Sequence, residues 1–208
     1  SSNYGNVEYL GEEINHQWSK AFEFETLFQS FVRETISPDI EYFSLLRPFS
    51  ELSIAKTFSE NSKYFNLFSS CNSTVLKKSV PLSMRWCGKC AKCAFVYLIL
   101  ASWLPKKKLV DIFGSNLFDD LHLKDIYEAL CGFGGIKPFD CVGTPDEVRA
   151  AVYLVSQKEE YFKDPLIVYL FKKITKSKTD MEKIVDKILM SRGRHAIPRQ
   201  FHDVLSFI

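Results

Sequence analysis

The sequence has no segment that would direct the chain into or across a membrane. Its first residues contain neither a basic stretch nor the apolar core of a signal peptide. The longest apolar stretch runs from Cys93 to Leu104, which is shorter than the roughly 20 residues that a bilayer requires. We therefore expect a soluble, cytoplasmic protein with no membrane partner, in which this stretch forms a buried helix.

A strong charge of either sign is also absent. The formal net charge is +2 over 208 residues, so no overall basic field favours nucleic acid as a partner. The charge is nevertheless uneven, because residues 1–60 carry 4 basic and 10 acidic side chains while residues 61–120 carry 9 and 3. The basic block surrounds a group of cysteines. Arg85, Lys89 and Lys92 could neutralise a thiolate cluster there, and the alternative interpretation is that the block binds a polyanion.

Internal repeats, linkers between folded units and strand patterns are scarce as well. The chain is long enough to bury a substantial core, and its 18 phenylalanines predict that this core is aromatic. Apolar residues recur at helical spacing over most of the sequence. The segments that we expect to be helical are 17–32, 50–58, 93–104, 109–113, 121–130, 144–155, 179–189 and a short piece in the tail after His195.

Two of these helices have clear starting signals. Ser50 is a suitable N-cap for the second segment, and Thr144 with Pro145 and Glu147 forms the pattern of a capping box with proline at the first helical position. Residues 1–12, in contrast, are irregular and extended in character. The predicted fold class is therefore mainly α, with a short N-terminal extended segment.

The cysteines give the strongest chemical signal. Cys87, Cys90 and Cys93 follow the pattern Cys-x2-Cys-x2-Cys, which is too tight for ordinary disulfide pairing and suits thiolates directed at one metal ion. Cys71 lies sixteen residues upstream in a polar loop that can fold back to supply a fourth ligand. Because a closed shell of four thiolates is structural, the sequence predicts a helical domain stapled by a structural zinc ion. The alternative is that Cys93 is a small core residue and the other thiols are free.

Two cysteines fall outside this cluster. Cys131 ends an amphipathic segment, and we expect it in the core. Cys141 lies in an extended segment between glycine-containing turns, where either a functional thiol or a buried structural one is possible.

Several unusual polar strings occur together in the chain. They are Asn15-His16-Gln17-Trp18-Ser19-Lys20, Tyr42-Phe43-Ser44-Leu45-Leu46-Arg47-Pro48, Ser70-Cys71-Asn72, Trp86-Cys87-Gly88-Lys89-Cys90-Ala91-Lys92-Cys93, Lys137-Pro138-Phe139-Asp140-Cys141-Val142-Gly143 and His195-Ala196-Ile197-Pro198. The strings resemble the C-terminal region of the UDP-N-acetylmuramoyl-L-alanyl-L-glutamate epimerase family, most clearly over residues 1–155. The cysteine pattern also looks like the zinc knot of 7-cyano-7-deazaguanine synthase and related ATP-pyrophosphatase-type enzymes.

The resemblance implies an ATP- and magnesium-dependent enzyme of peptidoglycan precursor synthesis. Such an enzyme converts the terminal L-glutamate of the UDP-muramoyl dipeptide into D-glutamate and releases AMP and pyrophosphate. Full-length members carry an upstream nucleotide-binding half with a Ser-Gly-Gly-x-Asp-Ser type loop, and that loop does not occur here. We therefore expect residues 1–12 to be the end of an upstream nucleotide-binding α/β domain or a linker. Residues 13–208 would form a helical, zinc-containing C-terminal domain that is inactive alone.

The candidate substrate-binding residues in the first quarter of the chain each have a structural alternative. Arg47, in an apolar setting, could clamp a carboxylate or phosphate or could form a buried ion pair with Glu51. Lys20 could bind phosphate. Asn15, His16 and Gln17 form a polar cluster that could contact substrate or cap the following helix, and His16 is a candidate catalytic residue.

The other candidates lie in the second half. Cys141, beside Asp140 and Lys137, could be an acid/base thiol, since amino-acid racemases do use cysteines. Lys137 and Asp140 would then contact substrate. His195 could touch phosphates, or it could be an ordinary surface histidine.

Two further functions compete with the epimerase. The zinc knot and the basic block could form a tRNA- or polyanion-binding module of an ATP-pyrophosphatase-type modification enzyme. The chain could also be a zinc-stapled scaffold that only docks an upstream domain.

Overall fold

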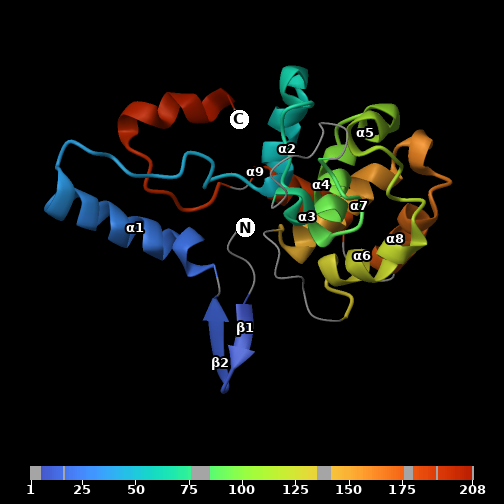
Figure 1. The fold of residues 1–208 in the computed structure, drawn as a ribbon, viewed down its shortest axis with the longest axis horizontal. Coiled ribbons are helices and arrows are strands. Elements are labelled where there is room, and N and C mark those ends of the chain that lie inside the picture. Colours follow the sequence, from blue (N-terminus) through green and yellow to red (C-terminus); the bar gives the residue numbers. More distant parts are fainter. Residues whose placement is uncertain are drawn as a thin grey trace.

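The structure is a computed structural model that describes residues 6–15, 17–75, 85–134, 142–175, 180–190 and 192–207. It is mainly helical, as the sequence predicted (Figure 1). The α-helices in the described part are α1 (Phe22–Phe31), α2 (Glu51–Ser59), α3 (Asn72–Val75), α4 (Ala91–Ala101), α5 (Lys106–Phe113), α6 (Lys124–Leu130), α7 (Pro145–Ser156), α8 (Pro165–Ile174) and α9 (Met181–Met190). Turns of 3-10 helix span Trp18–Lys20, Ser62–Tyr64, Leu121–Leu123, Glu159–Tyr161 and Arg199–Phe207, and a π-helical turn spans Val32–Ile36.

Helix α4 is the centre of the main body. Nine of its eleven residues are buried, so it is apolar on every side and has to be enclosed by other elements. Helices α2, α5, α6 and α7 pack against it, and α8 and α9 pack against α7. This is the buried helix that the apolar stretch after Cys93 predicted.

The core around α4 is aromatic, as the phenylalanine content predicted. Tyr97 of α4 meets Phe113 and Phe118 edge to face, with ring centroids 5.1 and 4.9 Å apart. Its hydroxyl donates to Asn116 Oδ1 at 2.9 Å, and Asn116 in turn donates to Asp164. The polar end of this buried tyrosine is therefore satisfied inside the core.

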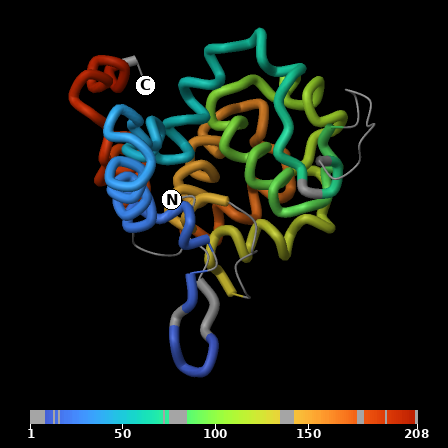
Figure 2. The backbone as a smooth tube through the Cα atoms, turned by 60° about the vertical axis from the view of Figure 1, so that its left-hand side comes forward, coloured from blue at the N-terminus to red at the C-terminus, as the bar shows by residue number. Residues whose placement is uncertain are grey.

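The remaining elements form a side lobe beside the main body, which we define as residues 17–49 and 192–207. Helix α1 lies next to the C-terminal segment, and both are set apart from α4 and α7 (Figures 1 and 2). The Gln29 side chain donates to the Ala196 carbonyl at 3.3 Å, and the rings of Phe43 and Phe201 lie 5.0 Å apart. Two segments that are far apart in sequence therefore pack together in this lobe.

A β-hairpin projects from the side lobe (Figure 1). Strands β1 (Asn6–Tyr9) and β2 (Glu12–Asn15) pair antiparallel, with Asn6 opposite Asn15. Leu10 and Gly11 have φ values of 53° and 80°, which is the two-residue turn with positive φ that tight hairpins favour. The hairpin confirms that this segment is extended. Its second strand, Glu12–Asn15, crosses the predicted boundary between residues 12 and 13. The division into 1–12 and 13–208 stays a prediction.

One carboxylate joins the starts of two helices. Thr144 and Glu147 form the predicted capping box of α7, in which Glu147 Oε2 accepts from the Thr144 amide at 2.7 Å. The other oxygen, Oε1, accepts from the Glu51 amide at the start of α2, also at 2.7 Å. Glu147 is 3% exposed. Two helix N-termini that are far apart in sequence are thus fixed to one buried carboxylate.

The other helix predictions have mixed outcomes. Ser50 caps α2 as predicted, because its side chain accepts from the Ser53 amide. The segment 17–32 is helical but is interrupted at Ala21, which separates a 3-10 turn from α1. Helix α8 was missed, although Asp164 and Pro165 stand where an N-cap and a first-turn proline belong.

The apolar stretch of α4 has only eleven helical residues. Among the described residues, none of the helices is both long enough and apolar enough to pass through a bilayer.

Replacing Glu147 by glutamine tests the junction of α2 and α7. The amide group would present N–H groups to backbone amides that now donate to a carboxylate, so we expect a loss of about 2 kcal/mol in the free energy of unfolding. Urea unfolding of the variant measures this. Asp146→Asn is the matched control, because Asp146 is 66% exposed and should change stability by less than about 0.5 kcal/mol. Equal effects of the two substitutions would contradict the proposed junction.

Glu51 gives a prediction about pH. Burial, and after it the charge of Glu147, raise the pKa of the Glu51 carboxyl above its ordinary value of 4.5. The carboxyl of Glu51 therefore holds its proton more tightly in the folded protein than in the unfolded chain. The free energy of unfolding falls as the pH rises from the ordinary pKa of 4.5 through the higher pKa of the folded state. We expect Glu51→Gln to be more stable than the parent at pH 7 and equal to it below about pH 4. Thermal or urea unfolding at the two pH values provides the measurement, and equal stability at pH 7 would refute the assignment.

Candidate metal centre and substrate-binding residues

Four cysteines converge at the start of α4, and they are the four that the sequence predicted. The sulfur atoms of Cys71, Cys87, Cys90 and Cys93 all lie within 4.8 Å of one another. Individual separations are 3.9 Å for Cys71 and Cys90, 3.7 Å for Cys87 and Cys93, and 3.5 Å for Cys90 and Cys93. Zinc bound to four thiolates at about 2.3 Å in tetrahedral geometry would separate the sulfurs by about 3.8 Å. The four thiols therefore fit a metal ion.

The local backbone explains how these residues reach one point. Gly88 has φ +68°, which lets the chain turn sharply after Cys87. Cys90 is the N-cap residue of α4, and its sulfur accepts from the Cys93 amide at 3.5 Å. The Lys89 amide donates to the Cys87 sulfur at 3.4 Å. Backbone N–H groups thus orient the sulfurs in the way that supporting hydrogen bonds orient the ligands of a metal.

Cys71 is brought in from a separate loop. The hydroxyls of Ser69 and Thr74 both donate to the Arg85 carbonyl, at 2.7 and 2.6 Å, so the Cys71 loop is tied to the segment that precedes Cys87. The Cys87 amide then donates to the Cys71 sulfur at 3.4 Å. Cys71 is fully buried. The predicted return of this loop is confirmed.

The electrostatics of the cluster also suit a cation. The hydrogen bond that the Cys90 and Cys93 thiols share lowers the pKa of the Cys90 thiol to about 4. The same bond, helped by burial, raises the pKa of Cys93. The lowered pKa of Cys90 favours its thiolate form, which is the form that a metal ion binds.

Cys131 is separate from this cluster. It is fully buried at the end of α6, and burial raises the pKa of its thiol to about 12. A thiol with that pKa is neutral and unreactive. The prediction of a core cysteine is confirmed.

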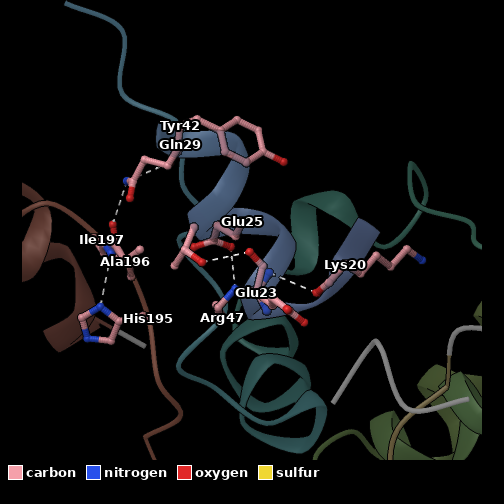
Figure 3. A network of polar contacts seen from close by, with 10 residues as sticks. Lys20, Glu23, Glu25, Gln29, Tyr42, Arg47, His195, Ala196 and Ile197 are labelled. Atoms are coloured by element: carbon pink, nitrogen blue, oxygen red, sulfur yellow. Dashed lines mark hydrogen bonds and ion pairs between the residues drawn. The ribbon is translucent and has the colours of Figure 1, made fainter. Parts of the chain in front are cut away.

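Arg47 has a buried partner, but it is a different one from the partner considered in the sequence analysis. Its Nε donates to Glu25 Oε2 at 2.5 Å and its Nη2 donates to the Lys20 carbonyl at 3.1 Å (Figure 3). The side chains of Arg47 and Glu25 are 17% and 3% exposed. The alternative of an ion pair with Glu51 was thus right in kind and wrong in partner.

The structure places the other described candidates around the same lobe. Lys20 is exposed in the 3-10 turn before α1. Gln17 is buried, and its backbone amide donates to Asn15 Oδ1 at 2.9 Å. His195 is half-buried, and its Nδ1 accepts from the Ile197 amide at 3.3 Å (Figure 3). Lys20 and Arg47 are therefore in contact, and His195 lies on the segment that runs past α1.

The predicted residues His16, Lys137, Asp140 and Cys141 lie outside the described residues. Sequence reasoning missed Glu25, although a signal for it exists. Ala21, Glu25 and Val32 recur at helical spacing and are all buried, so an acidic residue inside an apolar stripe indicates a buried cation nearby.

Comparison with known proteins assigns the chain to a family. The model of the MurL C-terminal domain matches residues 67–185, more than half of the chain, and the model of the MurL N-terminal domain matches residues 1–45. No solved structure matches the chain.

Three curated relatives carry the same name, UDP-N-acetyl-alpha-D-muramoyl-L-alanyl-L-glutamate epimerase. The protein from Xanthomonas oryzae pv. oryzae is 38% identical over 198 residues, which are 95% of this chain and 44% of the relative. The Micromonospora protein is 35% identical over 97% of this chain and 44% of its own length, and the Salinispora tropica protein is 38% identical over 78% and 35%. The chain thus spans less than half the length of each relative.

These matches define the chain first as a member of a family whose curated members are named as epimerases. It belongs to the MurL family, the UDP-N-acetylmuramoyl-L-alanyl-L-glutamate epimerases.

The metal centre predicts the metal content of the purified chain. We expect one zinc ion per chain by elemental analysis, and less than a tenth of that in Cys71→Ser, because three thiolates leave the shell open. Unfolding of Cys71→Ser should also require less denaturant, since binding energy of a structural metal contributes to folding. Cys131→Ala is the control and should keep its zinc. An unchanged zinc content in Cys71→Ser would contradict the four-ligand site.

The Arg47–Glu25 pair predicts a strong effect on stability. Arg47→Met leaves the Glu25 carboxylate buried without a partner, so we expect a loss of about 3 kcal/mol in the free energy of unfolding. The double variant Arg47→Met, Glu25→Gln should recover most of it. The exposed pair of Arg33 and Glu41 provides the control, because Arg33→Gln should cost less than about 0.5 kcal/mol. A double variant no more stable than Arg47→Met would show that the pair does not act as described.

Proposed function

We propose that this chain is the C-terminal part of an ATP- and magnesium-dependent cytoplasmic epimerase. Its substrate would be UDP-N-acetylmuramoyl-L-alanyl-L-glutamate, whose terminal L-glutamate it would convert to D-glutamate during peptidoglycan precursor synthesis. The observation that carries the proposal is the identity of 35–38% with relatives of that name over almost the whole chain. The four-cysteine cluster, which we propose holds a structural zinc ion, would fix the start of the central helix.

The reaction needs activation because the Cα proton of a glutamate carboxylate is a very weak acid. Removing it places negative charge beside an existing anion. In the proposed reaction the α-carboxylate attacks ATP to form an acyl-adenylate, and pyrophosphate leaves. The Cα proton then passes to a base, an acid returns a proton on the opposite face, and water releases AMP and the D-glutamyl product.

We assign the acid/base roles in this reaction to Cys141 and His16. A thiol and an imidazole can both exchange a proton near neutral pH. Arg47 and Lys20 would place positive charge near the substrate anions, with Asn15, Gln17, Lys137, Asp140 and His195 as further contacts. The pair of Arg47 with Glu25 supports a positioning role for Arg47, because its guanidinium is already oriented.

The side lobe and the β-hairpin support a nucleotide-binding partner domain of the same protein. Exposed large apolar side chains concentrate in the part of the chain that the N-terminal domain model matches or adjoins. They are Tyr9, Leu10, Ile14, Trp18, Leu27, Phe31, Ile36, Ile40, Tyr42 and Leu46. Such a concentration marks an interaction surface. We propose that the rest of a MurL N-terminal domain covers it.

A chimera tests the proposed function. In it, this chain replaces the matching stretch of the Xanthomonas oryzae relative. We expect the chimera to invert the terminal glutamate with ATP consumption and the 208-residue chain alone to be inactive. Within the chimera, Cys141→Ala and His16→Asn should each slow exchange of the Cα proton with deuterated water by at least about 100-fold while pyrophosphate release continues. Mass spectrometry and pyrophosphate release measure the two steps.

Cys131→Ala serves as the matched cysteine control and should leave both steps intact. A folded chimera that binds ATP without inverting glutamate, while the intact relative does so, would refute the proposal. Binding of tRNA by the chain with a steep dependence on salt would instead favour the polyanion-binding module.

A further inference from the structure

Two arginines in the C-terminal segment, Arg192 and Arg194, form no ion pair with any described residue. Both are exposed. The seven ion pairs of the described part use other cations, among them Arg47. Arg192 makes one long hydrogen bond, of 3.5 Å, to the Leu189 carbonyl. Two exposed arginines, separated by one residue in sequence, therefore have no acidic partner among the described residues.

Aromatic rings hold these arginines in place. The Arg192 guanidinium carbon lies 4.5 Å from the ring centre of Phe49, which is buried. The Arg194 guanidinium carbon lies 5.1 Å from the ring centre of Phe22, and that of Arg47 lies 6.0 Å from the same ring. Stacking on a ring restricts a guanidinium without using its N–H donors. The three cations are thus oriented around two phenylalanines.

The backbone fixes the two arginines relative to Arg47. The amide of Gly193, between them, donates to the Pro48 carbonyl at 2.7 Å. A Cβ atom at residue 193 would lie 3.4 Å from the Arg47 carbonyl oxygen, so the two segments are in close contact. Arg192 and Arg194 are therefore tied to the segment of Arg47 and Phe49 and are not on a free tail.

The acidic side chains of the neighbouring helix α1 interact with groups other than these two arginines. The backbone carbonyl of Lys20 accepts from Arg47, and the Lys20 side chain points away from Arg47 (Figure 3). The acidic side chains in the first turn of α1 are Glu23 and Glu25. Glu25 is bound by Arg47, and Glu23 accepts from the Trp18 indole at 3.4 Å. Neither of these carboxylates forms an ion pair with Arg192 or Arg194.

We propose that Arg192 and Arg194, backed by Arg47, form a binding site for the diphosphate group of a nucleotide. Guanidinium groups bind phosphate oxygens through paired N–H donors, and two of them match two linked phosphates. The site lies where the C-terminal segment meets the part of the chain that the N-terminal domain model matches. The choice of a nucleotide as carrier rests on the proposed function, whereas the anion chemistry rests on the arginines alone.

Calorimetric titration of the 208-residue chain with inorganic pyrophosphate tests this site directly. Arg192→Gln and Arg194→Gln should each weaken binding about tenfold, and the double variant about 100-fold. Arg194→Lys keeps the charge without the planar fork, so its affinity should lie between those of the parent and Arg194→Gln. Arg199→Gln is the matched control, because it removes the same charge from an exposed position on the same segment and should change affinity less than twofold.

Parallel titrations with UDP and with ATP distinguish the carrier. If UDP binds more tightly than pyrophosphate and loses affinity in Arg192→Gln and Arg194→Gln, the site belongs to the nucleotide-sugar substrate. If ATP shows this pattern instead, the site belongs to the activating nucleotide. No binding of millimolar pyrophosphate, or equal weakening by Arg199→Gln, would overturn the site. This measurement requires no turnover, so an inactive chimera with intact pyrophosphate binding would count against the proposed function alone.

Discussion

The structure depends on the burial of one helix that has no polar face. Nine of the eleven residues of α4 are inaccessible to solvent, and each must contact another element. Helices α2, α5, α6 and α7 provide those contacts, and their own positions follow from this requirement. A further contact lies at the C-terminal end of α4. The Trp103 indole beyond its C-terminus donates to the Leu52 carbonyl at 3.2 Å, which joins that end to α2.

The side lobe is organised on a different principle. Its interior contains the Arg47–Glu25 pair instead of a continuous apolar core, and many of its large apolar side chains are exposed. A lobe of this kind gains much of its stability from a few polar contacts between distant segments (Figure 3). The matches of separate family models to residues 1–45 and 67–185 agree with this contrast between the lobe and the helical body.

Sequence reasoning predicted the features that local chemistry specifies. The spacing of Cys87, Cys90 and Cys93 indicated a cluster of thiols that could hold a metal ion, and the Thr144–Glu147 pattern indicated a helix start, because both signals lie within a few residues. Contacts between distant segments could not be predicted in this way. Glu25 is 22 positions from Arg47, whereas Glu51 is only four away and was the natural candidate.

Other parts of the site were less accessible to sequence reasoning. Helix α8 was missed because its start, Pro165 to Phe171, is apolar without interruption, so its periodicity is weak. Glu147 was predicted as a cap of α7, but its second role, accepting from the start of α2, depends on tertiary packing. The cation group of the C-terminal segment likewise becomes visible only when Phe22 and Phe49 are seen beneath the guanidinium groups.

The sulfur of Cys90 has two structural roles. It is one of the four clustered thiols, and it also accepts the amide hydrogen bond that begins α4. A sulfur that has been oxidised or alkylated serves neither purpose well. Chemical damage at this single atom would therefore fray the first turn of the most deeply buried helix, so the redox state of one thiol is coupled to the integrity of the whole core.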